Sequence, residues 1–313
     1  MRAGLIFSAA LLCCGVGIAA ESVTTSSPKT YPLAVKTLLL GAASAGDAVL
    51  AVADRGFILR STDNGATWVQ QNSSVNVMLT AVHMTSATVG WAVGHDATIL
   101  NTVDGGVTWN VKLQDAKLET PLFDIWFENA AHGIAVGAYG LLEETTDGGV
   151  TWQERRISQD EPHLYTITAT ADGALFTVGE LGSIFKSTDH GATWALLQSP
   201  YKGTFFGALA LKDGGLLVYG LRGNLFRSDD GGQRWAALAT DTEASLIGAT
   251  QRADGTVVVV GLSGTVLTSG NGKTFRRTTR ADREALTGAV DAAGKLLVFG
   301  EKGVRALTAE APR

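Results

Sequence analysis

Five aspartates recur at one place in a repeated octapeptide, and carboxylates at fixed positions are the groups that acid–base hydrolysis uses. The octapeptide reads Ser or Thr, any residue, Asp, any residue, Gly, any residue, Thr, Trp. Its copies begin at Ser61, Thr102, Thr145, Ser187 and Ser228, and in the fifth copy Arg234 replaces the Thr. A two-carboxylate glycosidase needs a single pair of Asp or Glu residues, about 5–9.5 Å apart. Because one active site needs only one such set, a fivefold recurrence indicates a structural role.

The octapeptide, called the box from here on, has the composition of a tight turn. Asp and Ser/Thr side chains accept hydrogen bonds from nearby backbone amides, and Gly adopts the positive φ that other residues resist. The final Trp begins a strand, and its indole is large enough to fill a gap between neighbouring units. We therefore predict no catalytic residue here. The residues assigned this structural role are Asp63, Asp104, Asp147, Asp189 and Asp230, with Trp68, Trp109, Trp152, Trp194 and Trp235.

The spacing of the boxes predicts a repeat architecture. The five Trp residues lie 41, 43, 42 and 41 positions apart. A constant period of this length is typical of an array of identical supersecondary units. Such units cannot bury their faces alone, so they stack into one core.

A second repeat lies upstream of each box. Two small residues bracket a two-residue turn, with an apolar run before it and a short alternating run after it. Two β-rich runs around such a turn indicate a hairpin. With an inner strand before the hairpin and an outer strand opened by the Trp, each unit has four strands, which is one blade of a β-propeller. The turns span residues 53–56, 94–97, 137–140, 179–182, 220–223, 261–264 and 300–303.

Seven turns predict an all-β fold, a seven-bladed β-propeller with four-stranded blades. The sixth blade has a divergent box, residues 269–275, that ends in Phe275. The seventh blade stops after its third strand, near Val304 to Thr308. An open edge would expose unpaired amides, so we expect the ring to be closed by the N-terminal strand, Lys29 to Leu33. Pro28 and Pro32 suit an outermost strand.

The first 20 residues differ in kind from the remainder. Arg2 precedes a short apolar stretch that ends in small residues at Ala19 and Ala20, which predicts a cleaved signal peptide. The expected organisation is a signal peptide (1–20), a linker and closing strand (21–34) and the propeller (35–313). We expect an exported, periplasmic protein with no transmembrane segment after cleavage, or a luminal one in a thylakoid if the host is photosynthetic.

Composition excludes several classes of function. Both cysteines, Cys13 and Cys14, lie in the leader, so the predicted mature chain has no disulfide and no thiolate site. A formal net charge of −5 disfavours nucleic-acid binding, which needs a concentrated basic face. The five His residues lack the paired spacing of zinc sites, and no phosphate-binding glycine loop is present. We predict neither a metal nor a cofactor.

One enzymatic alternative remains open. The box also occurs in sialidases and other glycoside hydrolases. The resemblance to sialidases would imply a fixed catalytic set of three arginines, a Tyr–Glu nucleophile pair and an Asp acid. This chain has no Arg-Ile-Pro motif, and none of its five Tyr residues adjoins an acidic residue. A glycan-binding or glycan-cleaving propeller is therefore the alternative to a non-enzymatic scaffold.

The combination of boxes and glycine turns resembles the photosystem II stability/assembly factor family of Asp-box (BNR) repeat proteins. The phrases that carry the resemblance are residues 178–184 (Val-Gly-Glu-Leu-Gly-Ser-Ile) and residues 54–63, which run from a turn into a box. The similarity covers about residues 35–308. It implies a non-enzymatic scaffold that binds a membrane protein or an envelope complex. In photosynthetic members, the propeller holds a reaction-centre precursor and uses an arginine patch.

The predicted binding surface is the face that carries the turns and the links between blades, because loops on a rigid scaffold carry binding disproportionately. The boxes should lie on the opposite face. Arg and Tyr are the residue types that dominate binding hot spots. The candidate partner-binding residues are Arg55, His95, Asp96, Tyr139, Glu180, Arg222 and Lys302 in the turns, with His163 and Tyr165 in a link.

Overall fold

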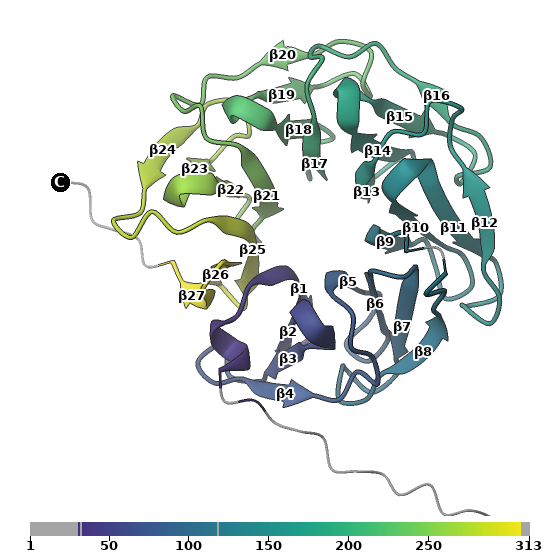
Figure 1. Cartoon of the computed structure of the whole chain (residues 1–313). Coiled ribbons are helices and arrows are strands. Elements are labelled where there is room, and N and C mark those ends of the chain that lie inside the picture. The colour runs from purple at the N-terminus through teal and green to yellow at the C-terminus, as the bar shows by residue number, and fades with distance from the viewer. Residues whose placement is uncertain (1–30, 32, 118, 308–313) are drawn as a thin grey trace, which may run out of the picture.

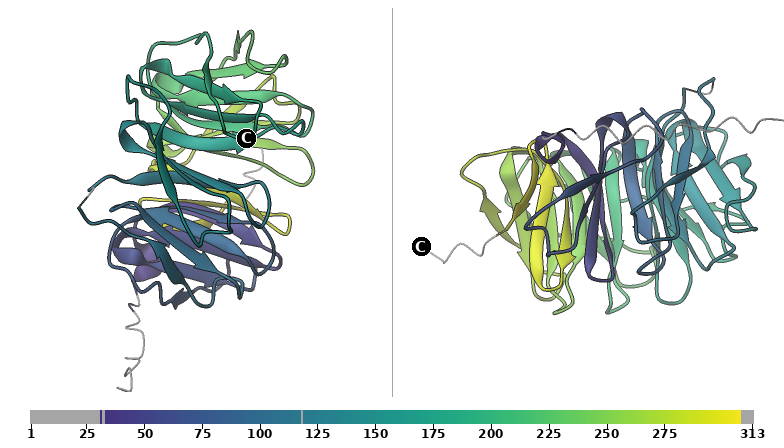
Figure 2. Two further views of the ribbon diagram at one scale, coloured as in Figure 1. Left: turned by 90° about the vertical axis from the view of Figure 1, so that its right-hand side faces the viewer. Right: turned by 90° about the horizontal axis from the view of Figure 1, so that it is seen from below.

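The computed structural model describes residues 31, 33–117 and 119–307, which form seven antiparallel sheets arranged in a ring (Figure 1). Within each sheet the strands follow chain order from the centre of the ring to its rim. Seen from the side, the strands run across the thickness of the ring (Figure 2). The chain is therefore a seven-bladed β-propeller, as the repeat predicts.

The blades follow one another along the chain. Blade 1 comprises β1 (Leu39–Ala45), β2 (Ala48–Ala53), β3 (Ile58–Ser61) and β4 (Val69–Gln71). Blade 2 comprises β5 (Leu79–Met84), β6 (Gly90–Gly94), β7 (Thr98–Thr102) and β8 (Asn110–Leu113). Blade 3 comprises β9 (Leu122–Phe127), β10 (Gly133–Gly137), β11 (Leu141–Thr145) and β12 (Gln153–Arg156). Blade 4 comprises β13 (Leu164–Ala169), β14 (Leu175–Gly179), β15 (Ile184–Ser187) and β16 (Ala195–Leu196).

The remaining blades repeat the pattern with one exception. Blade 5 comprises β17 (Phe205–Ala210), β18 (Leu216–Gly220), β19 (Leu225–Ser228) and β20 (Ala236–Ala237). Blade 6 comprises β21 (Leu246–Gln251), β22 (Val257–Gly261), β23 (Thr265–Ser269) and β24 (Arg276–Thr279). Blade 7 has three strands in the described part, β25 (Leu286–Ala292), β26 (Lys295–Gly300) and β27 (Gly303–Ala306). Short 3₁₀ turns are η1 (Ala34–Lys36), η2 (Asp54–Gly56), η3 (Ala138–Gly140), η4 (Glu180–Gly182), η5 (Leu221–Gly223) and η6 (Leu262–Gly264).

The second strand of each blade is the most apolar because both of its faces are covered by neighbouring blades. Every residue of β2 and of β22 is buried, and their sequences are Ala-Val-Leu-Ala-Val-Ala and Val-Val-Val-Val-Gly. Continuous apolar runs are typical of strands buried on both faces. The fourth strands lie at the rim, and β16 and β20 are exposed along their whole length.

The hydrophobic core is divided among the junctions between consecutive blades, and a box aromatic side chain packs into most of them. Trp109 is 3% exposed in the junction of blades 1 and 2, among Leu50, Val52 and Leu79. Trp68 packs in the junction of blades 7 and 1. The equivalent residues at the next junctions are Trp152, Trp194, Trp235 and, in the sixth blade, Phe275.

The box aspartates make their hydrogen bonds inside their own loops. In blade 3, Asp147 Oδ1 accepts hydrogen bonds from Thr145 Oγ1 (2.9 Å), Val150 N (3.0 Å) and Thr151 N (2.9 Å). Its Oδ2 accepts one from Thr151 Oγ1 at 2.6 Å. The bonds from Thr151 are the main reason that the pKa of Asp147 falls to about 2. Similar bonds surround the other four aspartates.

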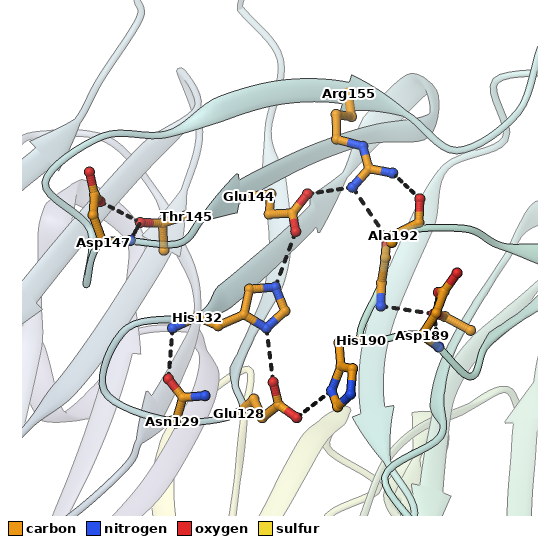
Figure 3. Close-up of polar contacts among 12 residues, drawn as sticks. Glu128, Asn129, His132, Glu144, Thr145, Asp147, Arg155, Asp189, His190 and Ala192 are labelled. Carbon is orange, nitrogen blue, oxygen red and sulfur yellow. Dashed lines mark hydrogen bonds and ion pairs between the residues drawn. The ribbon is translucent and has the colours of Figure 1, made fainter.

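Polar side chains also join neighbouring blades, as Figure 3 shows for blades 3 and 4. Glu128 accepts from both His132 Nδ1 (3.1 Å) and His190 Nδ1 (2.5 Å), and His190 belongs to the box of blade 4. Arg155 pairs with Glu144 and donates to the carbonyl of Ala192 at 2.6 Å. These contacts hold the box of blade 4 against two parts of blade 3, the loop between β9 and β10 and the fourth strand, β12.

The predicted closing strand lies largely outside the described residues. Of Lys29 to Leu33, only Tyr31 and Leu33 are described, and neither is in a strand. The chain then forms η1, where Ala34 and Val35 pack against Phe299 and Val304 of blade 7. The predicted signal peptide and residues 21–30 also lie outside the described residues, so closure by a strand of the N-terminus stays a prediction.

Candidate functional site

The tips of five predicted turns hold exposed side chains in a strained backbone conformation. Each 3₁₀ turn from η2 to η6 has a non-glycine residue with φ between 54° and 56° as its central member. Side chains other than Gly rarely adopt this left-handed region, and such strain concentrates at functional sites. Tyr139 is 56% exposed and Leu181 is 77% exposed. The five tip residues are Arg55, Tyr139, Leu181, Arg222 and Ser263.

The links between blades pack directly over these turns, so turns and links share one face. The Glu180 amide donates to the His163 carbonyl at 3.1 Å, which ties η4 to the preceding link. A Cβ atom on Gly182 would lie 1.9 Å from the carbonyl oxygen of Tyr201 in the following link. Only glycine permits this approach. The boxes connect the third and fourth strands and so lie at the opposite ends of the blades.

A β-bulge shapes the start of every inner strand on the same face. The pairing register of each inner strand with its neighbour skips the second residue. Bulges redirect a side chain and are often found beside functional sites. The seven bulge residues are Leu40, Thr80, Phe123, Tyr165, Phe206, Ile247 and Thr287.

Three consecutive bulge residues are aromatic, and their rings contact one another. The ring centroids of Phe123 and Tyr165 are 5.1 Å apart, and those of Tyr165 and Phe206 are 5.5 Å apart. The Tyr139 ring packs edge-on to His163 at 4.6 Å, and His163 lies 6.2 Å from Phe123. These five residues of blades 3, 4 and 5 form the site that we call the aromatic cluster.

Hydrogen bonds fix the polar members of the aromatic cluster. The Tyr139 amide donates to His163 Nδ1 at 2.9 Å, and the His163 amide donates to Glu180 Oε2 at 3.3 Å. Burial raises the pKa of the Tyr165 hydroxyl, and the nearby Glu180 carboxylate raises it further. Tyr165 therefore keeps its proton at neutral pH and can donate a hydrogen bond.

Asp124 supports the aromatic cluster from the strand that carries Phe123. Its Oδ2 accepts hydrogen bonds from Thr166 Oγ1 (2.8 Å) and Ile167 N (3.0 Å), which join the inner strands of blades 3 and 4. Burial outweighs these bonds and raises the pKa of Asp124 to about 6. Because the Asp124 carboxylate is hydrogen-bonded within the protein, we assign it the role of positioning the aromatic cluster.

The structure brings four of the nine sequence-predicted binding residues together and separates the other five. Tyr139, His163, Tyr165 and Glu180 meet at the aromatic cluster. The remaining five stand in other blades of the same face. They are Arg55, beside Asp54 in blade 1; His95 and Asp96 in blade 2; Arg222 in blade 5; and Lys302, paired with Glu284, in blade 7.

Sequence reasoning missed Phe123, Phe206 and Leu181. Phe123 and Phe206 each follow the buried residue that begins an inner strand, so aligning the repeats on that residue would have placed them with Tyr165. Their common orientation depends on a β-bulge, which no local sequence motif predicts. Leu181 lies beside Glu180 at the tip of the same turn, but only Glu180 was predicted to bind a partner.

A family model agrees with this architecture. The model described as photosynthesis system II assembly factor YCF48, built from BNR repeats, matches residues 111–278. The chain belongs to this family. No curated protein matches the sequence.

Solved structures resemble the chain over most of its length. The structure titled "YCF48 bound to D1 peptide" has a TM-score of 0.73 and 18% identity, and the match covers 88% of this chain and 95% of that one. YCF48 from Cyanidioschyzon merolae has a TM-score of 0.71 and 17% identity, with 87% and 96% covered. A streptogramin B lyase has a TM-score of 0.75 and 13% identity, with 87% and 95% covered. At these identities the likeness shows the propeller fold, which assembly factors and an enzyme share.

No helix among the described residues is long and apolar enough to cross a membrane. The same residues contain no group of three or more His, Cys, Asp or Glu side chains able to hold a metal ion.

Proposed function

We propose that this protein is an exported, non-enzymatic scaffold that binds an extended segment of a membrane-protein partner on its turn-and-link face. The observation that carries the proposal is the aromatic cluster, in which side chains of three neighbouring blades form one half-buried surface beside the exposed tips Tyr139 and Leu181. Membership of the YCF48 family supports it, because a YCF48 has been solved with a D1 peptide.

The chemistry of the aromatic cluster fits an extended peptide. Tyrosine presents a large apolar surface with few rotatable bonds and a hydroxyl that can bond a peptide carbonyl. Glu180 lies beside the rings and favours a segment with a basic residue at that point. Arg222 lies in the turn of blade 5, one blade after Glu180, and could contact an acidic residue of the same segment.

Export is part of the same proposal. The apolar stretch behind Arg2 and the small residues at Ala19 and Ala20 support secretion to the periplasm, or to a thylakoid lumen in a photosynthetic host. There, the turn-and-link face would meet the exported segments of membrane proteins.

The test is an array of overlapping peptides that covers the exported segments of the host's membrane proteins and includes a D1 peptide. The wild-type protein should bind a small set of peptides, and a Tyr139→Ala/Tyr165→Ala variant should lose about thirtyfold or more in affinity, as hot-spot tyrosines do. Leu196→Ala, at an exposed residue of the rim strand β16, is the matched control and should bind normally.

Two results would contradict the proposal. One is an array on which the double variant and the wild type bind equally. The other is turnover of a fluorogenic sialoside by the wild-type protein, which would favour the glycoside hydrolase alternative.

A further inference from the structure

One junction between blades has no aromatic side chain at its outer part. Six junctions hold a box Trp or Phe275, as described above. The buried cluster between blades 6 and 7 is entirely aliphatic, and only Leu296 and Leu307 pack on it from the partly buried shell. No described aromatic residue therefore takes the place of the indole at this junction.

The spacing of the chain explains this difference. In three blades the box Trp precedes, by seven residues, the carbonyl that covers the turn glycine. These pairs are Trp68 and Val75 over Gly56, Trp194 and Tyr201 over Gly182, and Trp235 and Thr242 over Gly223. In blade 7 the covering carbonyl belongs to Val35, and counting back seven residues reaches Pro28. In blades 6 and 3 the spacing is eight and nine residues, which from Val35 reaches Ser27 and Ser26. The chain has no aromatic residue at any of these three spacings.

A groove of about 880 Å³ lies at this place, between β24 of blade 6 and β27 of blade 7. Val258, Val266 and Leu296 supply its apolar lining. β27 is the outermost strand of its sheet among the described residues. This volume lies in the range of sites that hold a small ligand.

The groove is basic in a protein that is acidic as a whole. Arg276 and Lys295 line it, both are exposed, and neither forms an ion pair with a described residue. Arg305 also lines it and shares Glu284 with Lys302. The formal net charge of the chain is −5, so this local excess of cations stands out.

We propose that this groove binds a partner polypeptide through one aromatic side chain flanked by carboxylates. The partner's ring takes the place that box indoles occupy at other junctions, against Val258, Val266 and Leu296. Its neighbouring carboxylates pair with Arg276 and Lys295. The groove is a second docking surface, separate from the aromatic cluster, which belongs to blades 3 to 5.

The test uses three capped tripeptides as probes, Glu-Trp-Glu, Glu-Ala-Glu and Lys-Trp-Lys, titrated by NMR into the full mature chain. Glu-Trp-Glu should shift resonances of the groove residues and bind at least tenfold more tightly than either other peptide. Equal binding of the Trp and Ala peptides would overturn the proposal, since no ring would then be recognised.

Two neighbouring arginines provide a matched pair of variants. Arg276 lines the groove, whereas Arg277, the next residue of the same exposed strand, does not. Arg276→Glu should weaken Glu-Trp-Glu binding at least tenfold, and Arg277→Glu should leave it unchanged. An equal loss in both variants would show non-specific charge attraction and would overturn the proposal. Ala306→Trp, which fills the groove from β27, should also abolish binding, and unchanged binding would place the site elsewhere.

The competing occupant is the chain's own N-terminal segment. A thiol-to-amine cross-linker on an Ala306→Cys variant reports it, because both natural cysteines lie in the predicted leader. A cross-link to Lys29 in the free protein would overturn the proposal. Loss of binding at the aromatic cluster would not affect these outcomes, so the two proposals fail independently.

Discussion

Glu143 is a charged residue at a position of the repeat where other blades have a buried leucine. It is 4% exposed in β11, with no hydrogen bond or ion pair for its carboxylate among the described residues. At the same place before the box, blades 1 and 2 have Leu59 and Leu100. Burial, with the charge of Glu154 across the strand pair, raises the pKa of Glu143 to about 7.

Glu143→Leu should therefore stabilise the protein. At pH 8 we expect the free energy of unfolding to rise by about 1–3 kcal/mol, the cost of a buried polar group without a partner. Because the folded-state pKa is raised from 4.5 to about 7, the stability that wild-type Glu143 contributes is present below pH 4.5 and lost as pH rises to 7. The gain should shrink at pH 5, as measured by urea denaturation at both pH values.

Glu144→Leu is the control for that experiment. Glu144 is ion-paired with His132 and Arg155, so the same substitution one residue along should destabilise the protein at neutral pH. A gain in stability from both variants would show that apolar surface alone, and not the missing partner of Glu143, governs this strand.

At the scale of elements, the box is a loop held by its own carboxylate. The sixth blade offers a natural comparison, since Asn271 stands in the Asp position. Its Oδ1 still accepts from Lys273 N (2.9 Å) and Thr274 N (3.0 Å), which are backbone bonds like those of Asp147. The Thr274 hydroxyl donates to that same oxygen at 3.3 Å, whereas in blade 3 the Thr151 hydroxyl donates to the second carboxylate oxygen of Asp147 at 2.6 Å.

Asp147→Asn should cost stability at neutral pH and little at low pH. The pKa of Asp147 is lowered from 3.8 to about 2, so its contribution is present above pH 3.8 and lost as pH falls toward 2. Urea midpoints of wild type and variant should converge between pH 4 and pH 2. A difference that stays constant over this range would show that the carboxylate charge does not hold the loop.

Trp109→Ala should be among the most damaging single substitutions in the ring. Trp109 is 3% exposed and its Nε1 donates to the Gly106 carbonyl at 3.2 Å, so we expect a loss of about 3–5 kcal/mol in thermal or urea unfolding. Trp235→Phe is the matched mild change, because Trp235 Nε1 has no hydrogen-bond partner among the described residues. An equal loss of stability in both variants would contradict the larger role assigned to Trp109.

Much of the fold could be predicted from local chemistry. Boxes and turns are self-contained loops whose Asp, Gly and Trp residues have the same role in each blade, so their recurrence gave the blade count and the positions of the hairpins. The aromatic cluster could not be predicted in full. Phe123 and Phe206 face Tyr165 because of bulges in three separate strands, and a bulge register is set by packing between blades, not by neighbours in sequence.

The whole molecule is a ring whose two faces have different tasks. The box face is held by contacts within and between blades, such as those of Glu128 and His190. The turn-and-link face presents strained tips and the aromatic cluster. This division explains why the recurring box aspartates do not converge on one site. It also explains why the residues that vary from blade to blade lie on the turn-and-link face.

Site-specific photo-crosslinking in the native host tests the central claim most directly. A photoreactive phenylalanine analogue would replace Tyr139 at a tip of the turn-and-link face or, in a second strain, Val150, an exposed box residue that is 74% accessible. We predict one defined cross-linked membrane protein from position 139 and none from position 150. Cross-links of equal yield from both positions, or from position 150 alone, would contradict the account.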